Sequence, residues 1–222
     1  GNTVSDPKYK LEGNTNTVTI EWLNKDGAEL TVKPSDVGEY KVVVKVDEDT
    51  NYNSASDSKE FTISKADNTW VNELTIGGWT YGQNPNTPTA KSKFGDVVFS
   101  YSDKKDGTYT SAVPTNAGTY YVKATVEGTL NYTSLVSEPV EFTILKANTT
   151  LTITSSVDKT YDGNKVDEPT YQTSGSTGSV SINYQEYKDN KWSDLTKAPT
   201  SVGKYRVVVK IEEDTNYSSA SN

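Results

Sequence analysis

The chain repeats itself, and this repetition constrains its fold more than any other feature of the sequence. A Pro-x-x-x-Gly-x-Tyr motif occurs three times, and an Asn-Tyr pair follows each copy. Phe-Thr-Ile and Lys-Ala segments then close the first two copies, and a glycine recurs at equal spacing. These landmarks keep one order, so the sequence predicts three copies of one structural unit. The landmarks are Pro34/Gly38/Tyr40, Pro114/Gly118/Tyr120 and Pro199/Gly203/Tyr205; Asn51-Tyr52, Asn131-Tyr132 and Asn216-Tyr217; Phe61–Ile63 and Phe142–Ile144; Lys65-Ala66 and Lys146-Ala147; and Gly1, Gly82 and Gly163.

The segment after each motif alternates between apolar and polar residues. In the first copy Tyr40, Val42, Val44 and Val46 share one face, and the corresponding faces carry Tyr120, Val122, Ala124 and Val126, then Tyr205, Val207, Val209 and Ile211. A second alternating segment lies upstream in each copy, beginning near Val18, Val97 and Val180. Alternation of period two indicates strands of an antiparallel sheet with one face in a core.

Turn signals separate the expected strands, and helical periodicity is absent. Asp26-Gly27, Asp106-Gly107 and Asp189-Asn190 follow the upstream strands. Short strands between such turns predict an all-β fold of tandem immunoglobulin-like antiparallel β-sandwiches, with about seven strands per copy, arranged as an extended rod. The predicted domains are residues 1–66, which lack the first strand, 67–147, which are complete, and 148–222, which lack the last strand. We expect both incomplete domains to expose a sheet edge that pairs between chains or frays.

Composition excludes several classes of function. The chain has no Cys, no His and no Met, so it offers no disulfide, no thiol nucleophile and no zinc-thiolate site. The net charge of −8 opposes binding to nucleic acid. No run of about 18 apolar residues is present, so we expect no membrane insertion in this part of the protein. We predict no cofactor, no metal and no enzymatic activity.

Specific residues resemble the MBG and YDG-type immunoglobulin-like repeats of bacterial surface proteins. Lys159-Thr160-Tyr161-Asp162-Gly163 carries the likeness in the third copy, and Trp79-Thr80-Tyr81-Gly82 is a degraded form in the second. The Gly-x-Tyr strand start, the Asn-Tyr pair and the Phe-Thr-Ile segment also match. The resemblance implies an extracellular location on a bacterial cell, anchored to the wall through regions outside this fragment, and a role as a stalk or adhesive module.

Trp192 and Tyr109 are the candidate ligand-binding residues, because both stand beside an Asp-rich turn and the first copy has Ala28 or Glu29 there. An exposed ring at a hairpin tip can stack on a sugar, and the alternative is that each ring covers the nearby Pro motif. The acidic clusters 47–49 and 212–214 suit either Ca²⁺ or a solvated hairpin tip. For Asn51, Asn131 and Asn216 we expect a turn-capping role, and for the adjacent tyrosines a hydroxyl bonded to backbone.

These features favour structural stalk or spacer repeats of a bacterial cell-surface protein, such as an adhesin. The alternative is an adhesive module whose partner is a host glycan, mucin or surface protein. A third reading, a glycosidase, needs two carboxylates facing across a cleft, whereas the acids of this chain fall at turns and on outward faces of the expected strands.

Overall fold

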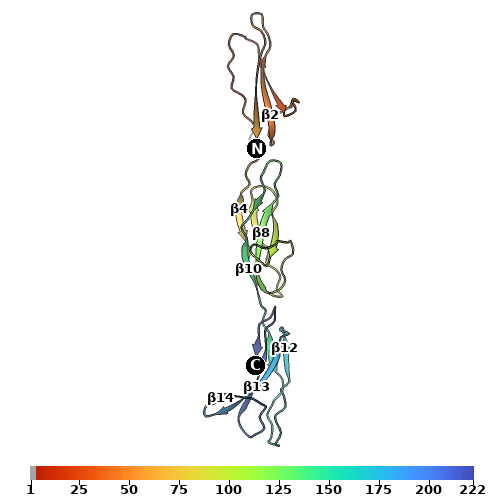
Figure 1. The fold of residues 1–222 in the computed structure, drawn as a ribbon, viewed down its shortest axis with the longest axis vertical. Helices are drawn as coiled ribbons and strands as arrows, with labels where there is room; N and C mark the ends of the chain where they lie inside the picture. Colours follow the sequence, from red (N-terminus) through yellow and green to blue (C-terminus); the bar gives the residue numbers. More distant parts are fainter. Residues whose placement is uncertain (1–3) are drawn as a thin grey trace. The chain divides into compact units, whose positions relative to one another are not determined.

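The computed structural model describes residues 4–222, and all of its regular elements are β-strands (Figure 1). Across these residues no helix has the length and apolar character needed to cross a membrane. The chain divides into two compact units whose border runs through the second copy. One unit comprises the described part of Gly1–Glu73 with Ala90–Val98 and Thr125–Val136, and the other comprises Leu74–Thr89, Phe99–Ala124 and Ser137–Asn222.

The first unit contains one antiparallel sheet in the order β1-β2-β3, formed by Val18–Asn24, Gly38–Val46 and Ala55–Ile63. On the central strand β2, Val42 and Val46 are buried, whereas Glu39 and Lys45 are exposed. This pattern confirms the predicted alternation, because the pleat sends successive side chains to opposite faces. The ring of Phe61 packs against Trp22 on the apolar face, with the two ring centroids 5.7 Å apart.

The second copy contains seven strands, the number predicted for a complete repeat. Its larger sheet has the order β5-β10-β8-β7 with β9 paired to β8, and its smaller sheet is β4-β6. All pairs with a described register are antiparallel except β5 with β10, which is parallel. The strands are β4 Trp70–Thr75, β5 Trp79–Thr80, β6 Thr89–Ser92, β7 Val98–Ser102, β8 Gly118–Val126, β9 Leu135–Val136 and β10 Val140–Leu145.

Phe142 lies at the centre of the aromatic core of this larger sheet. Its ring centroid is 5.3 Å from that of Trp79, 5.9 Å from that of Tyr120 and 6.1 Å from that of Tyr101. Val122 in the adjacent strand β8 is fully buried. The aromatic residues thus provide the core volume that aliphatic residues alone do not supply in this composition.

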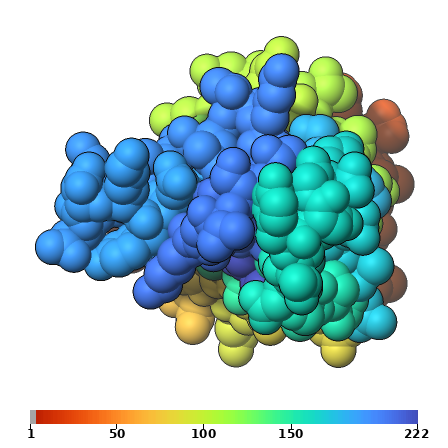
Figure 2. Space-filling view, turned by 90° about the horizontal axis from the view of Figure 1, so that it is seen from below, coloured from red at the N-terminus to blue at the C-terminus, as the bar shows by residue number. Residues whose placement is uncertain are grey.

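The third copy is a sandwich of two sheets, β11-β12 and β14-β13-β15-β16. Leu151 of β11 packs against Val209 and Ile211 of β15, and this contact joins the two sheets through a common core. The strands are β11 Thr150–Ile153, β12 Tyr171–Ser174, β13 Val180–Lys188, β14 Lys191–Leu195, β15 Tyr205–Ile211 and β16 Ala220–Ser221. The tip of the β13–β14 hairpin, in blue, projects at the left of Figure 2.

The predicted turns are present where the sequence indicated them. Gly27 has a φ of 82°, and its N–H donates to the carbonyl oxygen of Asn24. Asp189 and Asn190 have φ of 52° and 60°, the left-handed pair that a tight two-residue hairpin requires. The predicted domain borders 1–66, 67–147 and 148–222 stay predictions. Gly1, one of the recurring glycines, lies outside the described residues.

The number of strands differs between copies. Three strands lie between Val18 and Ile63, and six lie between Thr150 and Ser221. In the first copy the described residues 4–17 form no strand, and β3 is an edge strand that carries the charged residues Asp57, Lys59 and Glu60. Charges on an edge oppose pairing with another chain. That the exposed sheet edges pair between chains stays a prediction.

Candidate functional site

Each Asn-Tyr pair belongs to a turn that a side chain two residues upstream organises. In the third copy the Oδ1 atom of Asp214 accepts the N–H groups of Asn216, at 2.9 Å, and Tyr217, at 2.8 Å. Its Oδ2 atom accepts the N–H of Thr177 at 2.8 Å. Asp49 makes the same pattern of contacts in the first copy. In the second copy the Oγ1 atom of Thr129 accepts the N–H of Tyr132 at 3.2 Å.

These backbone hydrogen bonds stabilise the ionised form of the aspartates. The N–H of Thr177, followed by that of Asn216, lowers the pKa of Asp214 to about 2. The N–H groups of Asn51 and Thr15 likewise lower the pKa of Asp49. Within residues 4–222 no group of three or more acidic side chains is placed to hold a metal ion. The arrangement of both carboxylates is therefore that of a turn cap.

The side chains of Asn131 and Asn216 bond to the preceding copy and not to their own turn, so the turn-capping role predicted for these two asparagines was wrong. The Oδ1 atom of Asn131 accepts the N–H of Val37 at 2.8 Å, and its Nδ2 group donates to Oδ1 of Asp36 at 2.9 Å. Both partners lie in the Pro-x-x-x-Gly loop of the copy before. Asn216 repeats this geometry, accepting the N–H of Ala117 at 2.9 Å and donating to Oδ1 of Asn116 at 3.2 Å.

The Lys-Ala segment completes the same contact set. The N–H of Ala66 donates to the carbonyl oxygen of Asn131, and the carbonyl oxygen of Ala66 accepts the N–H of Thr133, at 2.9 and 3.0 Å. Ala147 makes the equivalent pair with Asn216 and Ser218. We call the contacts of Asp36, Val37, Ala66 and Asn131 the first joint, and those of Asn116, Ala117, Ala147 and Asn216 the second joint.

The recurring lysines lie beside these joints, and each makes one polar contact there. The Nζ atom of Lys65 donates to the carbonyl oxygen of Thr129 at 2.8 Å, and Lys146 pairs with Glu213 at 3.0 Å. Each lysine thus adds one contact from the closing segment of one copy to the Asn-Tyr turn of the next.

In the first two copies the tyrosine of the Gly-x-Tyr motif bonds the backbone through its hydroxyl, whereas within residues 4–222 no such bond is described for the Asn-Tyr tyrosines. The hydroxyl of Tyr40 donates to the carbonyl oxygen of Asp36 at 3.0 Å, and that of Tyr120 donates to the carbonyl oxygen of Asn116 at 3.1 Å. The rings of the Asn-Tyr tyrosines instead pack against other segments of the same copy. Tyr132 stacks on Phe94 with centroids 3.7 Å apart, and Tyr217 lies against Gly175.

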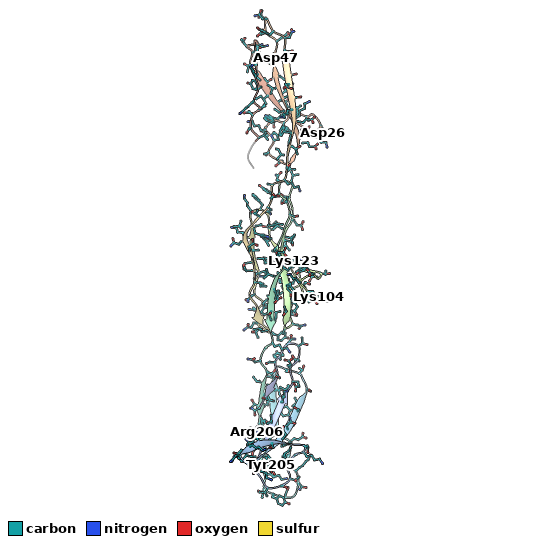
Figure 3. All side chains as sticks on the ribbon, turned by 60° about the vertical axis from the view of Figure 1, so that its left-hand side comes forward. Asp26, Asp47, Lys104, Lys123, Tyr205 and Arg206 are labelled. Carbon is teal, nitrogen blue, oxygen red and sulfur yellow. The ribbon has the colours of Figure 1, made fainter. Side chains whose placement is uncertain are left out.

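Trp192 is half-buried and belongs to a ladder of side chains across β14, β13 and β15. Its ring centroid lies 5.0 Å from that of Tyr187, and the guanidinium of Arg206 lies 4.6 Å from the Trp192 ring centroid. Next to this pair, Gln185 accepts from Arg206 and donates to Asp194. The ladder combines flat rings with hydrogen-bonding groups on one outward face, and Figure 3 labels Arg206 within it.

Tyr109 lies beside a different sheet, so the two candidate rings do not form one site. Its hydroxyl donates to the carbonyl oxygen of Lys105 at 2.7 Å, and the ammonium of Lys123, labelled in Figure 3, lies 4.3 Å from the Tyr109 ring centroid. Burial, with a smaller contribution from Asp106, raises the pKa of the Tyr109 phenol. In both cases a cation from the Gly-x-Tyr strand covers the ring, a cation–π contact that the sequence pattern did not indicate.

The sequence matches the MBG domain family over residues 12–67 and 147–222. These segments make up more than half of the chain and contain the first and third Asn-Tyr turns. The chain belongs to the MBG domain family. No curated protein matches the sequence. Among solved structures, the crystal structure of Drosophila N-cadherin EC1-4 is similar at 13% identity, with a TM-score of 0.22, covering 96% of this chain and 67% of that chain.

The sequence analysis did not predict which residues make the contacts between successive MBG repeats. Asp36 and Asn116 stand two positions after the motif proline, but Ser201 stands there in the third copy, so the position did not appear constant. The one available signal was the recurrence of asparagine before each tyrosine. A recurring polar residue on a turn is consistent with either a local cap or a distant partner.

Proposed function

We propose that this chain is a spacer segment of a bacterial cell-surface protein, in which serial MBG repeats hold a more distant region away from the cell. The joints are the observation that carries the proposal. Three contacts recur at the transitions from the first to the second copy and from the second to the third: those of the asparagine side-chain amide, the two backbone hydrogen bonds of the Lys-Ala alanine, and one contact of the lysine. Recurrence of a contact set at successive borders is what a serial array of fixed repeats requires.

Small-angle X-ray scattering tests this role. A compact chain of this length has a radius of gyration of about 17 Å. The spacer proposal predicts a radius of gyration at least about one and a half times this compact value, because serial repeats extend the particle. A radius of gyration near the compact value would contradict the proposal.

We also propose that the segment is not catalytic. A glycosidase needs one carboxyl group with a raised pKa opposite an ionised one. The carboxylates with the strongest shifts, Asp162 and Asp214, have their pKa values lowered to about 2 by hydrogen bonds from Lys159 and from backbone N–H groups. Hydrolysis of a panel of glycosides by the purified chain would overturn this proposal.

A second candidate function is binding of a host glycan or surface protein, and the Trp192 ladder is the observation in its favour. Rings beside Asp194 and Gln185 resemble the combination that holds a sugar by stacking and hydrogen bonds. Glycan-array and mucin binding of the wild type and Trp192→Ala would separate this function from a pure spacer. Tyr109→Ala is the matched variant in the second copy, and binding that neither change reduces would remove both rings as ligand sites.

A further inference from the structure

The joint asparagine uses both ends of its amide, and the partner of its NH₂ group differs in chemistry between the joints. At each joint Oδ1 accepts a backbone N–H, which every residue except proline can provide. The Nδ2 group of Asn131 donates to the carboxylate of Asp36, whereas that of Asn216 donates to the amide oxygen of Asn116. A carboxylate only accepts, but an amide can turn over and donate instead.

We propose that this asparagine is the recognition residue of the repeat-to-repeat interface, and that it selects a preceding loop with a hydrogen-bond acceptor two residues after the motif proline. The inference deepens the proposed spacer function and rests on it. The partner surface is the Pro-x-x-x-Gly loop of another MBG repeat, recognised through one backbone N–H and one side-chain oxygen.

Burial of the same motif positions agrees with this role. Asn131 and Asn216 are half-buried, whereas Asn51 is exposed and has no side-chain hydrogen bond within residues 4–222. The loop residues show the same contrast. Val37 and Ala117, whose N–H groups are bound, are half-buried, but Val202 at the equivalent position is 83% exposed. The turn therefore forms without the interface, and the interface covers the asparagine.

Replacement of each asparagine by aspartate gives opposite expectations at the two joints. In Asn131→Asp the new carboxylate faces the carboxylate of Asp36 at the place of a 2.9 Å hydrogen bond, so two negative charges repel each other. In Asn216→Asp the amide of Asn116 can turn its NH₂ group toward the new carboxylate and keep one hydrogen bond. Asn51→Asp is the matched control, since it changes the same motif position without a described partner loop.

Pulsed electron resonance between spin labels tests this in the full chain. The chain has no native cysteine, so Ser58→Cys with Lys91→Cys, both in the first compact unit, reports on the first joint. Ser111→Cys with Ser181→Cys, both in the second unit, reports on the second joint. We expect Asn131→Asp to broaden the first distance distribution, and Asn216→Asp and Asn51→Asp to leave both distributions narrow. The pair Asn131→Asp with Asp36→Asn restores an amide–carboxylate contact and should restore the narrow distribution.

The outcomes separate the inference from the proposed function. A narrow first distribution in Asn131→Asp, or broadening that Asp36→Asn does not reverse, would overturn the recognition role while leaving an extended spacer in place. Broad wild-type distributions together with compact scattering would overturn the spacer function itself. Hydrogen exchange within each copy identifies a variant that has merely unfolded, and the reversal by Asp36→Asn cannot arise from unfolding.

Discussion

Asp214 and Tyr217 are joined by a hydrogen bond of 2.8 Å from the backbone N–H of the tyrosine to the carboxylate of the aspartate. The same carboxylate binds the N–H of Asn216, whose amide then reaches the loop of the preceding copy. One aspartate therefore shapes the turn that presents the joint residue. This link between a local turn and a distant contact underlies the first prediction.

Asp214→Asn should change the pH dependence of stability in the third copy. The pKa of Asp214 is lowered to about 2 in the folded chain from an ordinary value of 3.8, so its contribution is fully present above about pH 4. The contribution is lost as the pH falls from about 4 to about 2, because protonation removes the stronger acceptor. Chemical unfolding of the third copy at a series of pH values, followed by pulsed hydrogen exchange of its peptides, should show the stabilities of wild type and variant converging at low pH.

Thr129→Ala is the control for that pH effect. Thr129 fills the position of the aspartate in the second copy, and its hydroxyl accepts the N–H of Tyr132 at 3.2 Å. A hydroxyl does not titrate in this range, so the loss of stability should be the same at each pH. If the stabilities of the wild type and of Asp214→Asn differed by the same amount down to about pH 2, the carboxylate would not be the capping group.

Gly175→Ala should destabilise the third copy more than Gly163→Ala. Both glycines have positive φ, of 115° and 80°, so each alanine is strained. A Cβ at Gly175 would lie 2.9 Å from the ring of Tyr217, whereas a Cβ at Gly163 meets nothing within 4 Å. We expect a cost of about 1 kcal/mol at Gly163 and a clearly larger one at Gly175, measured by chemical unfolding. Equal costs would show that Tyr217 does not need this glycine.

Phe142→Leu should weaken the second copy by removing the ring that contacts Trp79, Tyr101 and Tyr120. Phe142 is 4% exposed, so the smaller side chain leaves space in a closed core. We expect a loss of about 1–3 kcal/mol in the free energy of unfolding. Hydrogen exchange of the peptides covering β8 and β10 measures it, and unchanged protection there would contradict a central role for this ring.

Tyr120→Phe removes the hydroxyl that donates to the carbonyl oxygen of Asn116 at 3.1 Å. We expect a loss of about 0.5–1.5 kcal/mol, the usual net value of one hydrogen bond, as measured by urea unfolding. Tyr121→Phe is the comparison on the same strand, because its hydroxyl bonds the exposed carboxylate of Glu141. A larger effect at Tyr121 than at Tyr120 would show that the hydroxyl bond across the motif loop is not the important one.

The sequence by itself determined the repetition, the strands and the turns of this protein. Val42, Val122 and Val209 could be assigned to a core face because side chains alternate at every second position whatever lies elsewhere in the chain. The Asp189-Asn190 turn was readable for a similar reason, since positive φ is tolerated by few residue types. Such features depend on neighbouring residues alone.

Only the tertiary structure decided where the side-chain polar groups of the repeats bind. Asn131 and Val37 are 94 residues apart, and Asn216 and Ala117 are 99 apart, so no local pattern links them. The same holds for Lys123 over Tyr109 and Arg206 over Trp192, which depend on which strands become neighbours. An amide has no preferred partner in a sequence, because hydrogen-bond groups are specified by distance and angle, and these exist only after the chain has folded.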